Sequence, residues 1–397
     1  MPRLPDYTGA TVLFTVVQGL LAMATAAGPV VALAMLGELG LSTAWIGAYA
    51  PIVYGAAMFS SPASADLITR YGAVRVSQVA LLSAAAGLTL MGLGSTALVA
   101  VGAAIVGAAY GPGTPASSHV LARIVPPARQ PLVFSIKQTG VPLGTAAAGF
   151  ALPPIVVAVG WHAALFAAAA ACVVAALLIT PLRRRIDADR QPGSGRMFDI
   201  IGPLRLVLSS RGLRLLMIGC LALGLMQMCF VNFYVAFLED SAGFSKIAAG
   251  ALFGIAGIAG AAGRIFWGGV SGALLSPTRT LTLICVIVAA ITVAVTQLSA
   301  DWPFFIAAAL SAAFGATAMG WNGVYLAEVA RLAPPGAAGR ATGGMGVAMF
   351  GGVLFAPPVF GVILALSGYG AAFLVAGAAV LAGALPFVRA SRIGRRE

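Results

Sequence analysis

The stretch RRRIDADRQPGSGR, residues 183–196, separates two long apolar regions of the chain and decides how the rest is organised. It belongs to the only long polar stretch, at about residues 183–212. Residues 191–195 have the composition of a flexible linker, and we expect the flanking charges to keep the whole stretch in water. The sequence therefore divides into residues 1–182, a basic linker and residues 213–397.

The composition is that of a protein embedded in lipid. Of the 397 residues, 60% are hydrophobic and 9% are charged, whereas a soluble domain carries about 25% charged residues. The hydrophobic share of the chain is close to the roughly 240 apolar positions that twelve helical spans of about 20 residues need. A soluble enzyme and a large soluble domain are excluded. A transmembrane β-barrel is excluded as well, because its strands would alternate polar and apolar residues and residues 163–179 do not.

Apolar windows bounded by glycine, proline, serine or charge predict twelve membrane-spanning helices, six on each side of the linker. They lie at about residues 10–35, 44–67, 76–95, 98–120, 132–159, 162–182, 213–238, 245–270, 280–299, 303–327, 339–366 and 370–388. The first is interpreted as a retained span rather than a removed signal peptide. We expect an all-α polytopic membrane protein with two pseudo-symmetric six-helix bundles, residues 1–182 and 213–397, the second ending in a short basic tail.

The positions of the basic residues predict the orientation. With both termini in the cytoplasm, almost all of the 23 Lys and Arg residues fall on the cytoplasmic side, whereas Lys246 falls outside. Four acidic residues accompany it there: Glu38, Glu239, Asp240 and Asp301. This arrangement predicts a multi-pass protein of the bacterial inner membrane. The net charge of +12 is then explained by topology and by contact with anionic membrane lipids, and no nucleic-acid partner is expected.

Two short internal repeats favour homologous halves. ARIVPP at residues 122–127 recurs as ARLAPP at residues 330–335, after the fourth and the tenth predicted helix. Gly-Leu-Ser at residues 40–42 recurs as Gly-Phe-Ser at residues 243–245, where serine is a natural N-cap for the helix that follows. Both repeats are separated by about half the chain.

Residues 65–75, ADLITRYGAVR, lie between the second and third predicted helices. With Arg70, Gly72 and Arg75 they resemble the loop signature of the major facilitator superfamily, which is composed of Gly, Asp, Arg, Gly and Arg. Thr69 stands where the family has an acid before the first Arg, and Asp66, about one turn earlier, is the candidate substitute.

The counterpart in the second half, GRIFWG at residues 263–268, keeps the Arg and the Gly of the signature but has Gly272 where an acid is expected. The resemblance implies a secondary transporter whose loops close a cytoplasmic gate through charge pairs and a helix dipole. Because both loops depart from the pattern, we expect a gate that is weaker or differently placed. The candidate gate residues are Asp66, Arg70, Gly72, Arg75, Arg123, Arg264, Glu328 and Arg331.

Residues 134–144, FSIKQTGVPLG, are the most informative motif. They resemble the start of the fifth helix in bacterial family members that carry small anions, including cyanate-permease-like ones. Independently of that resemblance, the charge of Lys137 inside a span costs at least about 2.5 kcal/mol unless it is paired or hydrated. Three roles stay open for Lys137: binding of a substrate anion, pairing with Asp66 or Glu328, and snorkelling to the interface.

Glycines and prolines in two spans predict close packing and a break. Gly140, Gly144 and Gly149 permit close helix approach or a kink near Pro142 in the fifth span. Residues 111–115, GPGTP, are expected to break the fourth span. Such a break suits halves that rock about a central site.

Polar residues in the first, fourth, seventh and tenth helices are candidates for a central cavity, because the resemblance implies that these helices line it. With Lys137, the predicted substrate-binding residues are Gln18, Tyr110, Gln227, Asn232, Asn322 and Tyr325. Helix–helix hydrogen bonding is the alternative for any one of them. The four cysteines lie in apolar stretches and are expected to be packing residues.

These features favour a secondary transporter of a small organic or inorganic anion that works by alternating access. The alternatives are an efflux pump for lipophilic compounds and a non-transporting membrane sensor. No carboxylate lies near the middle of a predicted span, so proton coupling would run through groups near the gate, such as His119, or through the substrate; uniport and exchange stay open. We expect no enzymatic activity and no cofactor or metal, because the sequence contains no catalytic triad and no metal-ligand spacing. We also expect a monomer.

Overall fold

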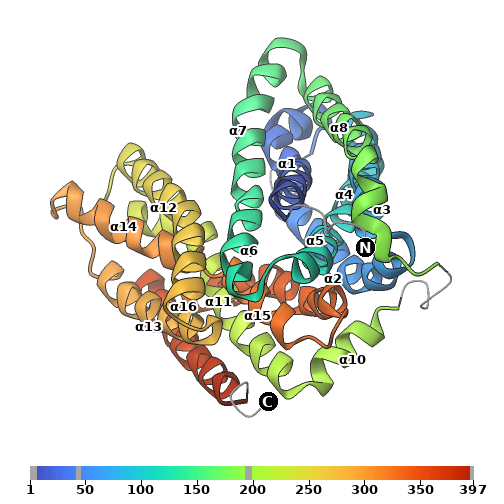
Figure 1. Cartoon of the computed structure of the whole chain (residues 1–397). Helices are drawn as coiled ribbons and strands as arrows, with labels where there is room; N and C mark the ends of the chain where they lie inside the picture. Colours follow the sequence, from blue (N-terminus) through green and yellow to red (C-terminus); the bar gives the residue numbers. More distant parts are fainter. Residues whose placement is uncertain (1–6, 42–45, 193–198, 394–397) are drawn as a thin grey trace. The chain divides into compact units, whose positions relative to one another are not determined.

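The structure, a computed structural model, describes residues 7–41, 46–192 and 199–393 (Figure 1). Every regular element in these ranges is helical, which confirms the predicted all-α class. Ten helical segments in the same ranges are long and apolar enough to cross a membrane.

Most predicted spans of the first half coincide with helices. Residues 7–178 contain α1 (Tyr7–Glu38), α2 (Ile46–Tyr71), α3 (Ala73–Gly92), α4 (Thr96–Tyr110), α5 (Gly113–Ile124), the 3-10 turn η2 (Pro127–Arg129), α6 (Gln130–Gln138), α7 (Gly140–Val159) and α8 (Trp161–Leu178). The fourth predicted span is broken between α4 and α5 at Gly111 and Pro112, as expected from its glycines and prolines. The fifth is broken at Thr139, directly after Lys137 and Gln138.

The linker forms short helical elements in its described part. They are η3 (Thr180–Leu182), α9 (Arg183–Ile186), η4 (Asp187–Asp189) and α10 (Ile201–Ser209). Residues 193–195 of the predicted flexible segment lie outside the described residues.

The second half contains longer helices. They are α11 (Arg211–Ala236), the π-helix η5 (Phe237–Ser241), α12 (Lys246–Ala273), α13 (Pro277–Val295), α14 (Phe304–Ala318), α15 (Asn322–Leu332) and α16 (Ala338–Ile393). The tenth predicted span is broken between α14 and α15, a break that no proline marks in the sequence. Gly368 in α16 has φ 79°, outside the helical region, so two helices meet at this residue.

Two compact units emerge from the contacts within the chain. One contains Met1–Pro126, Lys137–Val207 and Ala333–Gly351, and the other contains Pro127–Ile136, Leu208–Leu332 and Gly352–Glu397. We call them unit 1 and unit 2. Each unit therefore takes one short segment from the half of the sequence that mainly builds the other.

Unit 1 owes its tightest packing to glycines where α1 meets α7. A Cβ on Gly144 would overlap the backbone of Gly19, and a Cβ on Gly140 would overlap the carbonyl oxygen of Thr15. The predicted close approach is confirmed for Gly140 and Gly144. It is wrong for Gly149, where an added Cβ would meet no other helix within 4 Å.

The segment Ala333–Gly351 is held in unit 1 by polar contacts. The Ser61 hydroxyl donates to the Gly343 carbonyl oxygen at 3.3 Å, and Arg340 pairs with Asp199 at 3.0 Å. The start of α16 is thereby fixed to α2 and to the end of the linker.

Unit 2 has an aromatic core. Phe230 and Tyr234 of α11 pack against Phe314 of α14, with ring centroids 4.9 and 5.4 Å away, and the Tyr234 hydroxyl lies 2.7 Å from that of Ser311.

All four cysteines of the chain are buried and free, which confirms their predicted role in packing.

Candidate functional site

Lys137 occupies the last turn of α6 and is fully buried. Its Nζ donates hydrogen bonds to the amide oxygens of Gln18, at 3.0 Å, and of Gln138, at 3.1 Å. The snorkelling role is therefore wrong, because the ammonium is buried in unit 1 against the side-chain amides of Gln18 and Gln138.

Gln18 is the residue that receives the ammonium. It lies in α1 and is 1% exposed, and the Thr114 hydroxyl of α5 is 3.4 Å from the same amide oxygen. The glycine contact between α1 and α7 sets the spacing that allows Lys137 to reach Gln18. The acceptors of these two hydrogen bonds are amide oxygens, which carry no net charge.

Tyr110 lies at the end of α4 in a half-exposed aromatic cluster. Its ring meets Tyr54 edge-on at 6.3 Å and Phe350 at 5.9 Å. Phe350 belongs to the segment of α16 that packs in unit 1. This cluster joins three helices directly before the break at Gly111.

In unit 2 the structure brings two of the predicted binding residues together. The side-chain amide of Asn322 donates to the Gln227 amide oxygen at 3.0 Å and to the Met319 carbonyl at 3.3 Å. Asn322 opens α15 directly after the break in the tenth predicted span, so its amide is free to bridge α11 and the end of α14.

The other two predicted residues of unit 2 lie elsewhere. Asn232 is exposed and donates to the Met228 carbonyl of its own helix at 2.8 Å. Tyr325 is fully buried, and its ring packs edge-on against Trp321 with centroids 5.5 Å apart. Because these helices are apolar on nearly every face, the sequence does not show whether a polar residue points into the protein or away from it.

Among the predicted gate residues, Gly72 and Arg75 lie at the start of α3, and their partner comes from the linker. The two carboxylate oxygens of Asp187 accept from the backbone N–H groups of Val74, at 2.9 Å, and Arg75, at 3.1 Å. Gly72 has φ 96° and offers no capping side chain, and a Cβ there would overlap the Asp187 carboxylate. A negative charge at a helix N-terminus is favoured by the helix dipole.

Arg123 of α5 also binds the linker. Its guanidinium pairs with Asp189 and donates to the Ile186 carbonyl at 2.8 Å, and His119 lies 2.8 Å from the same Asp189 carboxylate. Asp187 itself is 3% exposed. The expectation that the whole linker lies in water is therefore wrong at Ile186 and Asp187, which are buried where the linker contacts α3 and α5, whereas Arg184, Arg185 and Arg190 around them are exposed.

Asp66 and Arg70 lie on the last turns of α2. Asp66 is 8% exposed, and the Arg70 guanidinium lies 5.4 Å from the centre of the Tyr71 ring. The side chain of Arg75 lies 3.4 Å from the Gln78 amide oxygen.

The gate candidates of unit 2 form local contacts. Arg331 makes a bidentate ion pair with Glu328 at 2.8 and 2.7 Å, and Glu328 is fully buried. Arg264 is 3% exposed and donates to the Met319 carbonyl at 3.2 Å, at the end of α14. Arg264 thus satisfies a carbonyl that the break before α15 leaves without a helical partner.

Sequence reasoning missed three residues of these networks: Gln138, Asp187 and Asp189. The sequence does contain a signal for the two aspartates, because they are the only acidic residues in the arginine-rich stretch RRRIDADR, residues 183–190. Gln138 directly follows Lys137, and only the hydrogen bond in the structure reveals that both side chains meet.

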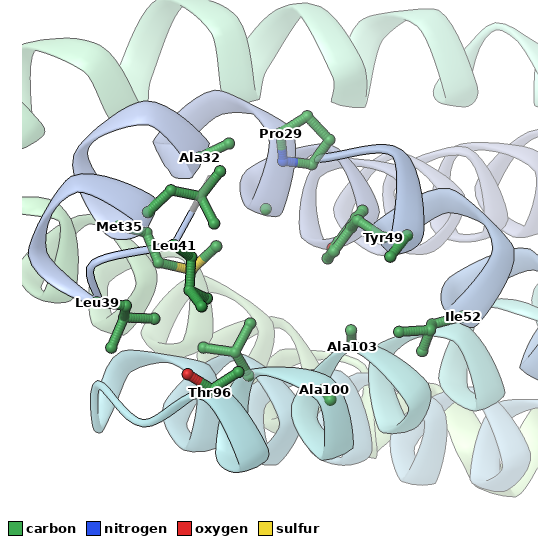
Figure 2. Close-up of a pocket in the computed structure, with 14 residues that line it drawn as sticks. Pro29, Ala32, Met35, Leu39, Leu41, Tyr49, Ile52, Thr96, Ala100 and Ala103 are labelled. Atoms are coloured by element: carbon green, nitrogen blue, oxygen red, sulfur yellow. The ribbon is translucent and has the colours of Figure 1, made fainter. Parts of the chain in front are cut away.

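A small apolar cavity lies between α1, α2 and α4 (Figure 2). Its volume is about 80 Å³, and Pro29, Met35 and Tyr49 contribute to its lining. The Tyr49 hydroxyl donates to the Thr25 carbonyl at 3.1 Å, so it is turned away from any ligand. Sites for drug-sized ligands usually measure about 300–1,000 Å³, which makes this cavity too small for one.

The sequence model of the Major Facilitator Superfamily matches residues 13–343. An uncharacterized MFS-type transporter of Mycobacterium tuberculosis strain CDC 1551, MT3072, is 26% identical over 316 residues, 77% of this chain and 67% of its own length. Rv2994 of strain H37Rv, described in the same words, matches with the same identity and coverage.

Solved structures share the fold at low identity. The transporter FucP in the outward conformation has a TM-score of 0.76 at 14% identity, covering 97% of this chain and 99% of its own. A bacterial homologue of the iron transporter ferroportin in an outward-facing state has a TM-score of 0.75 at 15% identity, covering 96% and 99%. The human organic anion transporter MFSD10 has a TM-score of 0.69 at 14% identity, covering 96% and 100%.

Proposed function

The chain belongs to the Major Facilitator Superfamily and is a transporter rather than an enzyme, and from this premise we propose that it moves a small anion across the inner membrane by alternating access. The observation that carries the choice of substrate is the buried ammonium of Lys137. The proposed binding residues around it are Gln18, Gln138 and Thr114, which supply neutral oxygens.

An ammonium in this setting favours an anionic ligand on electrostatic grounds. Its charge acts in a low-dielectric interior, where attraction to an anion is stronger than in water. The amide oxygens of Gln18 and Gln138 are weaker partners than a carboxylate, so a substrate anion gains by replacing one of them. The amide NH₂ groups of the same side chains then supply donors to the anion.

The solved structures do not identify the substrate of this chain. FucP is a fucose:proton symporter of E. coli and MFSD10 is an organic anion transporter, yet both are 14% identical to this chain. A likeness at this level concerns the fold alone. The proposal therefore relies on Lys137 and on the resemblance of residues 134–144 to small-anion carriers.

The proposed architecture has twelve spans, both termini in the cytoplasm and two bundles, residues 1–182 and 213–397. Two observations support twelve spans over the ten apolar segments. α2 is 26 residues long although its prolines and serines lower its hydropathy, and Gly368 divides the 56-residue α16 into two helices. A helix needs about 20 residues to cross the hydrocarbon core.

The test is a thermal-shift screen of the purified protein with acetate, succinate, nitrate, phosphate and cyanate, and with the lipophilic cation tetraphenylphosphonium. We expect at least one anion to raise the melting temperature, since a ligand at 100 times its Kd stabilises the folded state by about 2.7 kcal/mol. Lys137→Met should abolish that shift. Lys246→Met is the matched control, because the other lysine of the chain is exposed at the start of α12.

An anion-dependent shift that survives Lys137→Met would remove this lysine from the substrate site. A shift with tetraphenylphosphonium alone would instead favour efflux of lipophilic compounds. Radiolabelled uptake of the stabilising anion into proteoliposomes then compares Lys137→Met with Lys246→Met, and only the first should lose transport.

A further inference from the structure

A groove of about 630 Å³ lies in unit 1 between α2, α3 and α4. It is separate from Lys137 and from the cavity of Figure 2. Leu67 of α2, Val76 and Val79 of α3 and Ile105 of α4 supply apolar surface to it. Val79 is 54% exposed, so the groove opens sideways on a surface that the composition of the chain places in lipid.

Two serine hydroxyls in the walls of this groove already donate hydrogen bonds within the protein. The Ser60 hydroxyl donates to the Ala57 carbonyl and the Ser64 hydroxyl to the Ser61 carbonyl, both within α2. These hydroxyls are therefore satisfied by their own helix. The wall suits a hydrocarbon chain.

Two arginines give one end of the groove a positive charge. Arg75, exposed in the first turn of α3, and Arg183, half-exposed at the start of α9, both contribute to its lining. The Arg183 Nε is buried, has no hydrogen-bond partner in the described ranges, and lies 3.9 Å from an Asp187 carboxylate oxygen. Both oxygens of that carboxylate already accept from the backbone N–H groups of Val74 and Arg75, so Asp187 offers the Arg183 guanidinium only this longer contact.

The groove extends from this charged end along the helices. Ser83 lines it eight residues beyond Arg75 on α3, which is about 12 Å at the rise of an α-helix. Charge at one end and an apolar trough opening into the bilayer match the two parts of a phospholipid. Guanidinium groups bind phosphate through paired hydrogen bonds, and basic residues at the membrane surface select anionic headgroups.

We propose that this groove is a binding site for an anionic phospholipid, with the phosphate on Arg75 and Arg183 and an acyl chain between α2, α3 and α4. A lipophilic cation is the wrong ligand for this site, because the arginines repel it. A small soluble anion would leave the apolar trough empty. The inference goes beyond the proposed transport of an anion and does not depend on Lys137.

The test measures lipid binding to the purified full chain by native mass spectrometry. The probes are palmitoyl-oleoyl phosphatidylglycerol and the phosphatidylcholine with the same acyl chains. We expect phosphatidylglycerol to bind about tenfold more tightly or better, and the double variant Arg75→Gln/Arg183→Gln to remove that preference. Arg184→Gln is the matched control, since this exposed arginine neighbours Arg183 but does not line the groove.

A second variant tests the trough rather than the charge. Ala108→Trp places a bulky ring in the groove and should weaken both lipids while leaving the arginines in place. Arg183→Gln alone makes the same test of the headgroup if the double variant does not yield folded protein. The proposal fails if the two lipids bind equally to the unaltered protein, if the arginine variants keep the preference, or if glycerol 3-phosphate competes as well as phosphatidylglycerol.

Discussion

Asp187 is distant in the sequence from the helix that it caps, 113 residues from Val74. Residue Gly72 occupies the N-cap position of α3, has no side chain to accept a hydrogen bond, and leaves the space that the carboxylate fills. The resemblance to the family led us to expect a charge pair and a helix dipole in this loop, with its usual acid missing. The linker supplies an acid at this helix dipole.

Replacement of Asp187 by alanine should lower stability. The change leaves two backbone donors of α3 without their acceptor, and loss of an N-cap costs about 0.5–2 kcal/mol. Thermal unfolding of the purified protein measures the loss, and hydrogen exchange at Val74 and Arg75 should rise. Asp301→Ala, an exposed aspartate before α14, is the control. Equal melting temperatures for the two variants would show that the cap contributes nothing.

Arg123 and Arg331 show how related positions find different partners. They occupy the same place in the repeats ARIVPP and ARLAPP, each at the end of a short helix. Arg331 pairs with Glu328, which lies three residues earlier on α15. The corresponding position of α5 is Val120, and Arg123 pairs instead with Asp189 of the linker. The repeat predicts the arginines, and because residue 120 is not an acid, Arg123 finds its acid in the linker.

At the scale of elements, the contact of α1 with α7 determines the environment of Lys137. The backbones approach at Gly19 and Gly144, where no side chain fits between them. Lys137 precedes α7 by one break, so any increase in this spacing withdraws Gln18 from the ammonium. Packing and the proposed binding of an anion are therefore expected to be coupled through one helix pair.

Gly144→Ala should destabilise the protein and weaken the anion-dependent thermal shift. An extra methyl group in a tightly packed contact costs about 1–3 kcal/mol. Gly149→Ala on the same helix is the control: its Cβ would meet no other helix within 4 Å, and alanine favours a helix over glycine by about 0.5–1 kcal/mol. Unfolding temperatures with and without the stabilising anion compare the two. A Gly144→Ala protein as stable as Gly149→Ala would contradict the close approach.

The sequence was sufficient for elements that depend on composition and insufficient for contacts between distant residues. Continuous apolar runs identify helices because lipid requires every backbone group to be satisfied within its own segment. The break at Gly111 and Pro112 follows from local chemistry. The break before Asn322 and the docking of Asp187 depend on tertiary contacts, and no local pattern encodes them. For Lys137 the sequence left three roles open, and burial against Gln18 removed one.

At the scale of the whole molecule, the number of spans determines which surface each loop occupies. The ten apolar segments omit α2 and count α16 once. If α2 crosses the membrane and Gly368 separates two spans, both termini lie on the same side. With the N-terminus in the cytoplasm, failure of α2 to cross moves every later loop to the other side, and Lys137 and Arg75 no longer belong to the predicted cytoplasmic side. If α2 crosses but Gly368 does not separate two spans, only the chain after Gly368 changes side.

Single cysteines introduced around the two contested spans test the topology. The native cysteines are buried and should give little background with a membrane-impermeant maleimide. We expect Gly37→Cys and Ser367→Cys to react in intact cells, and Arg75→Cys and Arg392→Cys to react only after permeabilisation. All four positions are exposed, so access to a membrane face is the difference that labelling detects. Reaction of Gly37→Cys and Arg75→Cys from the same side would show that α2 does not span, and the same pattern for Ser367→Cys and Arg392→Cys would show it for the last helix.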